Sequence, residues 1–433
     1  MLFRRRLPFG PRLAWLCACL IAFGSVHAQV VRETGTPIVP TATQLLDWAE
    51  TAYPAYFPGH RADLVLSPYI YRYYPQTGNY AGVSGSDVYI WGPVSANAPA
   101  PVMVGTLADF ACQVQPQPCG TKATHRVQVA GLEREFIVYQ PYKAVASAPA
   151  VIMIHGTSGD GERYFNISGW REVADREGLI AVFPSALVHC FFEDEDRDGV
   201  IESSERQVTT KWAAGTLGVE GARPLCTAAD LAQLSAERRA LADHPLADDM
   251  AFFRSIVESL RTQYPTDMSR VYVSGFSNGA EMSARLATEE STTYAAAAVN
   301  ASSLHVPAVP APRAMSVVLA IGEIDPGIAA ELGYSTGIPL DGSVADNPTF
   351  RAHMVTPFTT VLRLDPAVHS YQPVQRYGTR LSQVVYSSST AGLANTLRTV
   401  IIEGADHQYP NGTNHPVKMA ELLWEFFREQ RLP

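Results

Sequence analysis

The stretch "RVYVSGFSNGAEMSARLA", residues 270–287, is the strongest indication of the fold in the sequence. It places Gly275, Ser277 and Gly279 in a GxSxG pattern, directly after the apolar run "VYVS" and directly before an amphipathic helical pattern. This order is typical of a nucleophile elbow, a strained turn between a strand and a helix that exposes the serine hydroxyl. The two glycines let neighbouring backbone approach without a Cβ clash. We therefore predict that Ser277 is a catalytic nucleophile rather than the cap of an ordinary helix.

Short apolar runs alternate with helical patterns around this elbow. The runs have the composition of strands that are buried on both faces, and they are "APAVIMIHG", "GLIAVFPSA", "MSVVLAIGE" and "LRTVIIEGA". Between them, "ADDMAFFRSIVESLRTQY" repeats apolar residues every three or four positions, as one face of a helix does. This alternation predicts an α/β fold with a mostly parallel central sheet. Ahead of it, "THRVQVAGLEREFIVYQP" predicts a β-hairpin that turns at Ala130 and Gly131.

A serine nucleophile needs a base, and the base needs an acid that fixes its tautomer. In enzymes with this elbow, the acid and then the histidine follow the serine along the chain. His407 follows the last apolar run, and Asp325 lies just past "MSVVLAIGE", so we predict these two as base and acid. Five residues stay open as alternatives, which are His415 for the base and Glu323, Asp341, Asp346 and Asp365 for the acid.

An oxyanion hole requires two backbone N–H groups aimed at the carbonyl oxygen that gains charge. One is expected from Asn278, the residue after the nucleophile. The other is expected from the loop "IMIHGTSGDG", where Gly156 and Thr157 are the candidates and Thr157 is preferred. His155 in this loop is expected to support the turn rather than to transfer protons.

The segment "FFEDEDRDGVIESSERQ", which begins at Phe191, has the pattern of a calcium-binding loop. Such a loop places oxygen ligands at positions 1, 3 and 5, a glycine at 6, a backbone carbonyl at 7 and a carboxylate at 12. Counting from Asp194, the predicted ligands are Asp194, Asp196, Asp198, the carbonyl of Val200, and Glu205. Acids packed this closely would repel one another without a cation, which argues against a merely solvated turn.

The flanks of this insert lack the long amphipathic helices that open a signalling calcium sensor. We therefore predict a structural calcium ion and no organic cofactor. The insert follows the strand "AVFPSA", and loops after the strands surround the active site in folds of this class. The calcium ion is expected to brace a wall of the pocket that includes Trp212.

The chain begins with "MLFRRRLPFGPRLAWLCACLIAFGSVHAQVV", which has the basic, apolar and small-residue order of a bacterial-type secretory signal. We expect cleavage after Ala28 and a secreted protein, extracellular or periplasmic, with a lipoprotein anchor at Cys19 as the alternative. No later run reaches the roughly 18 apolar residues of a membrane span. The formal net charge of −9 argues against nucleic acid and anionic lipid as partners.

Four cysteines remain after the expected cleavage, an even number in an exported chain. They predict two disulfides, of which Cys112–Cys119 and Cys190–Cys226 form the simplest of three possible connectivities. No CxxC pair indicates zinc or redox chemistry.

A smaller unit precedes the α/β region. "TATQLLDWAETAYPAYFPGH" predicts a brief amphipathic helix, and "YIYRYYPQTGNYAGVSGSDVYIWGP" predicts an antiparallel meander. Through "YRYYPQTGNYAGV", this unit resembles a small tyrosine-rich module of secreted proteobacterial proteins. The predicted division is a signal peptide at 1–28, a linker at 29–40, a small aromatic-rich α+β domain at 41–120, and a catalytic domain at 121–433 with the calcium-loop insert at 191–206.

Six segments together resemble the polyhydroxybutyrate depolymerase and feruloyl esterase group of α/β-hydrolases, over roughly residues 121–433. They are "IHGTSGDGERYF", "WREVADREGLIAVFPSA", "ADDMAFFRSIVESL", "RVYVSGFSNGAEM", "IGEIDP" and "GADHQYPNG". Three features depart from the pattern of the group: Thr157 stands where many relatives have Cys, Tyr409 stands where many have Trp, and the insert at 191–206 is additional.

This resemblance implies an α/β-hydrolase fold and a secreted serine carboxylester hydrolase that works through an acyl-enzyme. Its implied substrates are hydroxyalkanoate polyesters, aromatic esters or related acyl esters, with polymeric and small esters both open. It also implies that Trp212 in "TTKWAAG" and Tyr409 contact the substrate. The alternative from another class is a catalytically silent, calcium-dependent binding or adhesion protein on a hydrolase scaffold.

Overall fold

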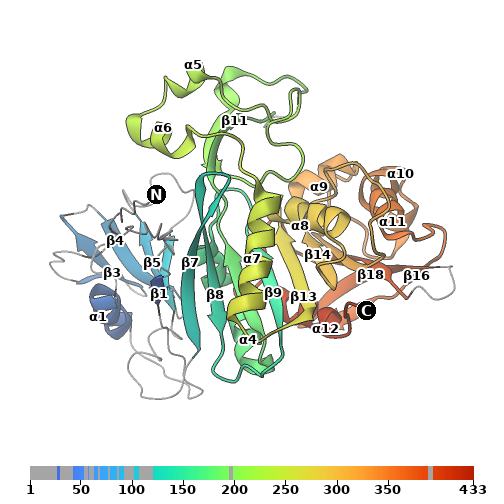
Figure 1. The fold of residues 1–433 in the computed structure, drawn as a ribbon, viewed down its shortest axis with the longest axis horizontal. Coiled ribbons are helices and arrows are strands. Elements are labelled where there is room, and N and C mark those ends of the chain that lie inside the picture. The colour runs from blue at the N-terminus through green and yellow to red at the C-terminus, as the bar shows by residue number, and fades with distance from the viewer. Residues whose placement is uncertain are drawn as a thin grey trace, which may run out of the picture.

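The structure is a computed structural model that describes nearly all of the chain from residue 120 onward and parts of the chain before it (Figure 1). The described residues are 27–29, 42–52, 57, 63–66, 69–76, 79–84, 87–91, 102–106, 120–194, 198–388 and 394–433. Among these residues, no helix has the length and apolar character needed to cross a membrane.

A twelve-stranded sheet organises the molecule. Its strands, in spatial order, are β1 (His27–Gln29), β7 (Thr121–Val129), β8 (Leu132–Gln140), β10 (Ile180–Pro184), β9 (Ala148–Ile154), β13 (Thr266–Phe276), β14 (Ala296–Asn300), β15 (Ser316–Gly322), β19 (Thr396–Ile402), β18 (Thr379–Ser387) and β16 (His369–Tyr371), with β17 (Val374–Arg376) also paired to β18. The six strands from β10 to β19 are parallel, whereas β7, β8 and β18 pair antiparallel with their neighbours. This is the strand arrangement of the α/β-hydrolase fold, so the predicted fold class is confirmed.

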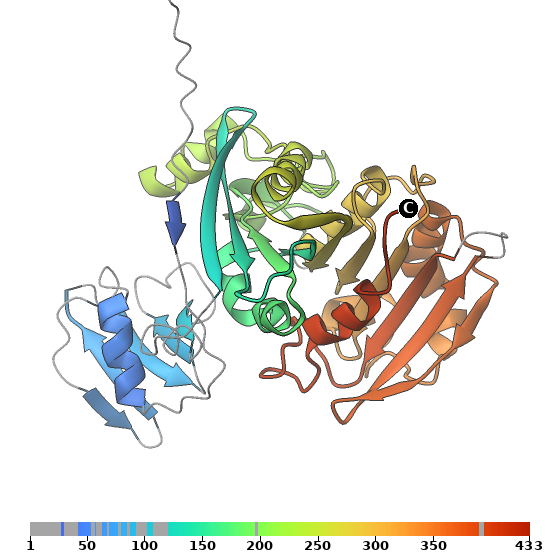
Figure 2. The same cartoon turned by 60° about the horizontal axis from the view of Figure 1, so that its bottom comes forward.

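Helices cover both faces of this sheet. They are α3 (Gly161–Ile167), α4 (Trp170–Glu177), α7 (Asp249–Gln263), α8 (Asn278–Glu289), α9 (Pro326–Glu331), α10 (Pro348–Phe350), η4 (Arg351–Val355), α11 (Thr356–Leu362) and α12 (Met419–Phe427), with a 3₁₀ turn η3 (Ser343–Asp346). Helices α4 and α12 lie on one face and α7 and α8 on the other (Figures 1 and 2).

The local sequence explains these elements. All residues of β9, β10, β14 and β15 are buried, as their apolar composition requires for strands covered on both faces. The β7–β8 hairpin turns at Ala130 and Gly131, which both have positive φ, the combination of a type I′ turn. Helix α7 starts where the Asp248 side chain accepts a hydrogen bond from the Ala251 N–H, and it buries the predicted apolar face.

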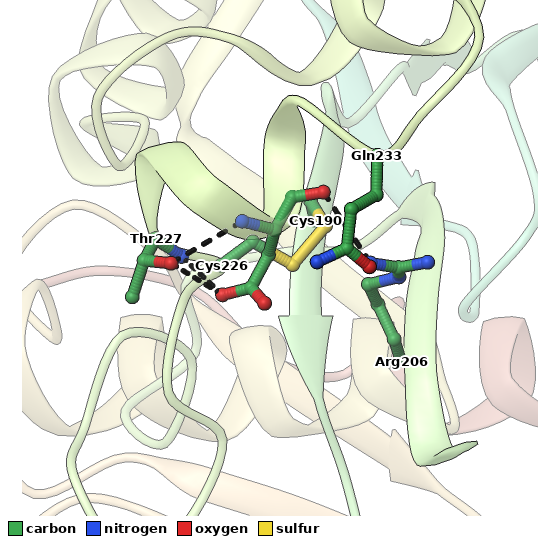
Figure 3. The surroundings of a disulfide bond; sticks show 6 residues. Cys190, Arg206, Cys226, Thr227 and Gln233 are labelled. Carbon is green, nitrogen blue, oxygen red and sulfur yellow. Dashed lines mark hydrogen bonds between the residues drawn. A yellow bond between two sulfur atoms is a disulfide. The ribbon is translucent and has the colours of Figure 1, made fainter. Parts of the chain in front are cut away.

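A long excursion, residues 188–226, leaves the sheet after β10. Strands β11 (Val188–Phe192) and β12 (Arg206–Thr210) pair antiparallel within it, and the 3₁₀ turn η2 (Ser203–Glu205) precedes β12. The predicted Cys190–Cys226 disulfide is present, with the two Cα atoms 5.3 Å apart (Figure 3). In the chain-entropy view, closing a loop of this length stabilises the fold by about 3–4 kcal/mol. Cys112 and Cys119 lie outside the described residues.

Two short helices follow the excursion, α5 (Ala228–Leu231) and α6 (Ala236–Ala242), and they lie beside β11 (Figure 1). The acidic loop sits at the tip of the β11–β12 hairpin rather than between two helices. This position agrees with the expected absence of flanking helices, because the loop is carried by strands.

The small N-terminal unit packs helix α1 (Ala42–Ala52) against a five-stranded antiparallel sheet. The strands are β2 (Asp63–Leu66), β3 (Tyr69–Tyr74), β4 (Asn79–Ser84), β5 (Asp87–Trp91) and β6 (Val102–Thr106). Trp48, Phe57 and Tyr74 belong to a core that is separate from that of the large sheet. These three aromatic side chains are therefore packing residues. The expected residue limits of the domains stay predictions.

Candidate active site

The GxSxG segment forms a sharp turn between β13 and α8. Ser277 has φ 52° and ψ −123°, a strained backbone conformation for a residue with a side chain. A Cβ on Gly275 would lie 1.9 Å from the Gly279 carbonyl oxygen, and a Cβ on Gly279 would lie 2.3 Å from the Ile154 carbonyl oxygen. Both positions therefore exclude any other residue. The Ser277 N–H donates to the Asn300 carbonyl at 2.9 Å, which anchors the turn to β14.

The structure brings together the three residues that the sequence singled out. The Ser277 Oγ lies 3.0 Å from the His407 Nε2, and the His407 Nδ1 lies 2.6 Å from the Asp325 Oδ2. Because a carboxylate only accepts, this network assigns the imidazole proton to Nδ1 and leaves Nε2 to accept from the serine hydroxyl. The His407 side chain is 43% exposed and the Asp325 side chain 1%, so the imidazole is open to solvent and the carboxylate is buried.

Asp325 has a second task, because it is also the N-cap of α9. Its Oδ1 accepts the backbone N–H groups of Gly327 and Ile328, both at 3.1 Å, while Oδ2 faces His407. The helix cap thus fixes the rotamer of the carboxylate.

The alternatives have other partners. Glu323 accepts the Gly404 N–H at 2.8 Å, and the His415 Nε2 lies 3.0 Å from the Glu403 carbonyl oxygen. Among the described residues, none of the three remaining candidate acids forms a hydrogen bond with His407, and they are Asp341, Asp346 and Asp365.

Two backbone N–H groups are available beside Ser277. Thr157 and Asn278 line the same pocket as Ser277, and neither N–H donates a hydrogen bond within the described part of the chain. Gly156 lets the loop pass close to Ser277, since a Cβ there would lie 3.2 Å from the Ser277 Cβ. Unused donors of this kind suit a developing oxyanion, and Asn278 is also the first residue of α8.

The His155 imidazole stabilises this loop through two hydrogen bonds. Its Nε2 accepts the Ala186 N–H at 2.9 Å, and its Nδ1 donates to the Gly156 carbonyl at 2.7 Å. Burial lowers the pKa of His155 to about 4, so the imidazole is neutral.

The interpretation of Trp212 and Tyr409 as substrate contacts is corrected by their burial. Trp212 is 0% exposed, and its indole Nε1–H donates to the His155 carbonyl at 2.8 Å. Tyr409 is 4% exposed and packs against Phe276 and Tyr164. Both rings are therefore packed beneath the site, where they support the elbow and its neighbouring loop.

A pocket of about 520 Å³ opens over Ser277 and His407. We refer to its polar and charged lining residues as the charged wall, which comprises Glu193, Lys211, Arg223, Glu281, Ser302, Ser303 and His305. We refer to Pro326, Gly327, Ile328 and Met354 as the apolar wall, and Glu331 of α9 lines the pocket beside them. The sequence did not indicate the charged wall, since its members come from segments far apart in the chain. Only one sequence feature points to the charged wall, which is that Glu281 lies one helical turn after Asn278.

The predicted calcium loop is described in part. The Asp194 carboxylate accepts the N–H groups of Asp198 and Gly199 at 3.2 and 3.0 Å, and Gly199 has φ 87°. Glu205 accepts the Glu202 N–H at 3.0 Å. Asp196 lies outside the described residues, and within them no three His, Cys, Asp or Glu side chains form a group that could hold a metal.

No family model and no curated protein matches the chain. Solved structures of esterase-type α/β-hydrolases resemble it at low identity. An acetyl xylan esterase from Aspergillus awamori is 13% identical with a TM-score of 0.41, over 70% of this chain and 98% of its own. An S-formylglutathione hydrolase from Agrobacterium tumefaciens is 13% identical with a TM-score of 0.39, over 72% and 96%. The feruloyl esterase module from Clostridium thermocellum is 13% identical with a TM-score of 0.37, over 68% and 85%. Likenesses this weak say nothing of the substrate, so the chemistry has to be argued from the side chains.

Proposed function

We propose that this protein is a secreted serine carboxylester hydrolase that works through an acyl-enzyme. The observation that carries the proposal is the hydrogen-bonded line from Ser277 through His407 to Asp325, with Ser277 on a strained elbow. An unstrained surface serine beside a histidine would not require Gly275 and Gly279 at close backbone contacts. The Cys190–Cys226 disulfide supports export, because disulfides persist in oxidising compartments.

In the first half of the reaction, the Ser277 Oγ attacks the ester carbonyl carbon while the His407 Nε2 takes the hydroxyl proton. The carbonyl oxygen becomes an oxyanion that the N–H groups of Thr157 and Asn278 stabilise. Asp325 accepts from the His407 Nδ1–H throughout and stabilises the imidazolium. The tetrahedral intermediate then collapses, and the departing alkoxide takes the proton from Nε2 as the alcohol leaves.

In the second half, a water molecule attacks the acyl-enzyme and gives one proton to the His407 Nε2. A second tetrahedral intermediate forms and collapses. The Ser277 Oγ leaves the acyl carbon and recovers the proton from Nε2, so the carboxylic acid departs and the enzyme is regenerated.

For the substrate we propose a hydroxyalkanoate polyester, an aromatic ester or a related acyl ester. The resemblance in the sequence supports this class, and the pocket, polar on one wall and apolar on the other, suits an ester with one polar and one apolar side. The test is hydrolysis of p-nitrophenyl acyl esters, methyl ferulate and polyhydroxybutyrate film by the wild-type protein. Turnover of at least one class supports the proposal, and no turnover of any class refutes it.

Fluorophosphonate labelling separates this enzyme from a silent binding protein. A working triad makes the Ser277 Oγ nucleophilic, so one fluorophosphonate should attach per chain, at Ser277, by peptide mass mapping. Prior treatment with phenylmethylsulfonyl fluoride is the control and should block the attachment. An unlabelled, folded protein would favour the silent scaffold.

We also propose that the acidic loop holds a structural calcium ion. Carboxylates at Asp194, Asp198 and Glu205 and the carbonyl of Val200 fit the oxygen preference of calcium, with Asp196 as the expected further ligand. The geometry of the described part agrees with this use, since Gly199 adopts the positive φ that the loop demands. Calcium would supply charge compensation that fixes the hairpin tip.

Calcium removal should lower the thermal stability of the protein. At millimolar calcium and a dissociation constant of about 10⁻⁴ M, binding stabilises the folded state by about 1.5 kcal/mol. Excess EGTA should therefore lower the melting temperature by about 2 °C. Glu205→Gln, which keeps an acceptor for the Glu202 N–H, should abolish this difference. Equal melting temperatures with and without EGTA, and no heat of calcium binding, would contradict the proposal.

A further inference from the structure

A network of four charged side chains joins the excursion to the nucleophile helix. The Lys211 Nζ and the Arg223 Nε each lie 2.7 Å from a carboxylate oxygen of Glu193. The Arg223 Nη1 lies 3.1 Å from the Glu281 Oε2. We refer to Glu193, Lys211, Arg223 and Glu281 as the bridge network. All four line the pocket over Ser277.

This network ends at the expected oxyanion donor. The Asn278 Nδ2 donates to the Glu281 Oε2 at 3.0 Å and to the Trp212 carbonyl at 3.3 Å. The Asn278 Oδ1 accepts the Trp212 N–H at 2.6 Å. The side chain of Asn278 is thus held between Glu281, on its own helix, and the backbone of Trp212. Glu281 therefore helps to fix the residue whose N–H is the expected oxyanion donor.

Glu281 creates an electrostatic problem that the network solves. Its side chain is 7% exposed and lies on the pocket wall, where a bare carboxylate would repel an oxyanion. The groups that face it are Arg223, Lys211, His305, whose Nε2 is 3.7 Å from the Glu281 Oε1, and the amide of Asn278. Burial alone would raise the pKa of Glu281. The charges of Arg223, His305 and Lys211, in that order of effect, and the hydrogen bond from Asn278 outweigh burial and lower the pKa.

We propose that Arg223 is a positioning residue for catalysis, which neutralises Glu281 and so holds Asn278 with its N–H directed at the oxyanion. The inference rests on the proposed ester hydrolysis and adds the role of the excursion to it. Arg223 hydrogen-bonds to Glu193, Thr216 and Glu281 and to no member of the triad, although it lines the same pocket. Its effect is therefore on transition-state binding, exerted through Glu281 and Asn278.

The test compares Arg223→Met with the double variant Arg223→Met/Glu281→Gln on a p-nitrophenyl ester. Arg223→Met removes the largest compensation of the Glu281 charge, so kcat should fall about 10- to 100-fold with KM changed less than about threefold. The double variant removes that charge and keeps an acceptor for the Asn278 Nδ2, so kcat should return to within about fivefold of the wild type. Arg223→Lys should also keep most of the rate, because it retains the cation.

A pH profile supplies a readout that a purely structural tie would not change. Without Arg223, the pKa of Glu281 rises, with Lys211, His305 and Glu193 as the remaining charged neighbours. At low pH, Glu281 is then protonated and does not repel the oxyanion. It becomes charged as the pH increases. The kcat of Arg223→Met relative to the wild type should therefore decline with increasing pH, and this decline should be absent from the double variant.

Arg206→Met is the matched control, since Arg206 is in the same excursion and bonds to the Asp230 carbonyl and to Gln233, away from α8 (Figure 3). It should leave kcat unchanged. A wild-type kcat in Arg223→Met, or a double variant no faster than Arg223→Met, would overturn the inference while the proposed function stands. If Arg223→Met does not fold, a tenfold loss of kcat in folded Arg223→Lys overturns it. A wild-type protein that neither hydrolyses esters nor reacts with fluorophosphonate removes both proposals.

Discussion

Replacing Ser277 by alanine should lower kcat for ester hydrolysis by roughly 10⁴- to 10⁶-fold, because it removes the atom that attacks the carbonyl. Alanine keeps the backbone N–H that donates to the Asn300 carbonyl, and it has the same Cβ at φ 52°. The melting temperature should therefore change by less than about 2 °C. Steady-state kinetics with a p-nitrophenyl ester and a thermal melt measure both quantities.

Ser370→Ala, at an exposed position on β16, is the control and should retain full activity. KM for the Ser277→Ala protein should stay near the wild-type value, since the pocket walls are intact. If Ser277→Ala keeps more than a tenth of the wild-type kcat, the nucleophile is another group and the proposed mechanism is wrong.

The second large effect is expected for Asp325→Asn, with a fall in kcat of about 10⁴-fold. An asparagine can direct its amide N–H groups at the His407 Nδ1, which moves the imidazole proton to Nε2, where it blocks acceptance of the serine proton. Its single side-chain oxygen, in the place of the Asp325 Oδ1, can still accept the N–H groups of Gly327 and Ile328, so the start of α9 should persist. Kinetics together with a thermal melt therefore separate a lost tautomer from a lost fold.

Glu323→Gln is the control for the choice of acid. Its carbonyl oxygen can replace the carboxylate oxygen that accepts the Gly404 N–H, so it should lower kcat less than about threefold. A larger loss in Glu323→Gln than in Asp325→Asn would reverse the assignment.

The central sheet and the group of Ser277, His407 and Asp325 were predictable because the sequence patterns that indicate them are local. A GxSxG turn between an apolar run and a helix encodes its own geometry, and the positions of Asp325 and His407 follow from strand ends. Strand β14 was missed, since "AAAVN" has weak strand propensity. It forms because α8 packs against it and small side chains permit that approach.

Burial and long-range ion pairing were not predictable from the sequence. Trp212 and Tyr409 have the residue types of a substrate-binding surface, but their exposure depends on which loop covers them. The bridge network joins residues 18 and 58 positions apart, through Lys211 with Glu193 and Arg223 with Glu281. No periodicity relates such positions, so only the fold brings them together.

The double use of Asp325 limits how the pocket can be altered. The residues that follow it, Pro326 to Ile328, line the apolar wall, while its two carboxylate oxygens separately cap α9 and orient His407. A replacement of this wall that shifts the start of α9 will also turn the acid, so acyl selectivity and turnover will change together. Libraries aimed at selectivity alone should keep the Asp-Pro-Gly start of α9 fixed and vary Met354 on the neighbouring segment instead.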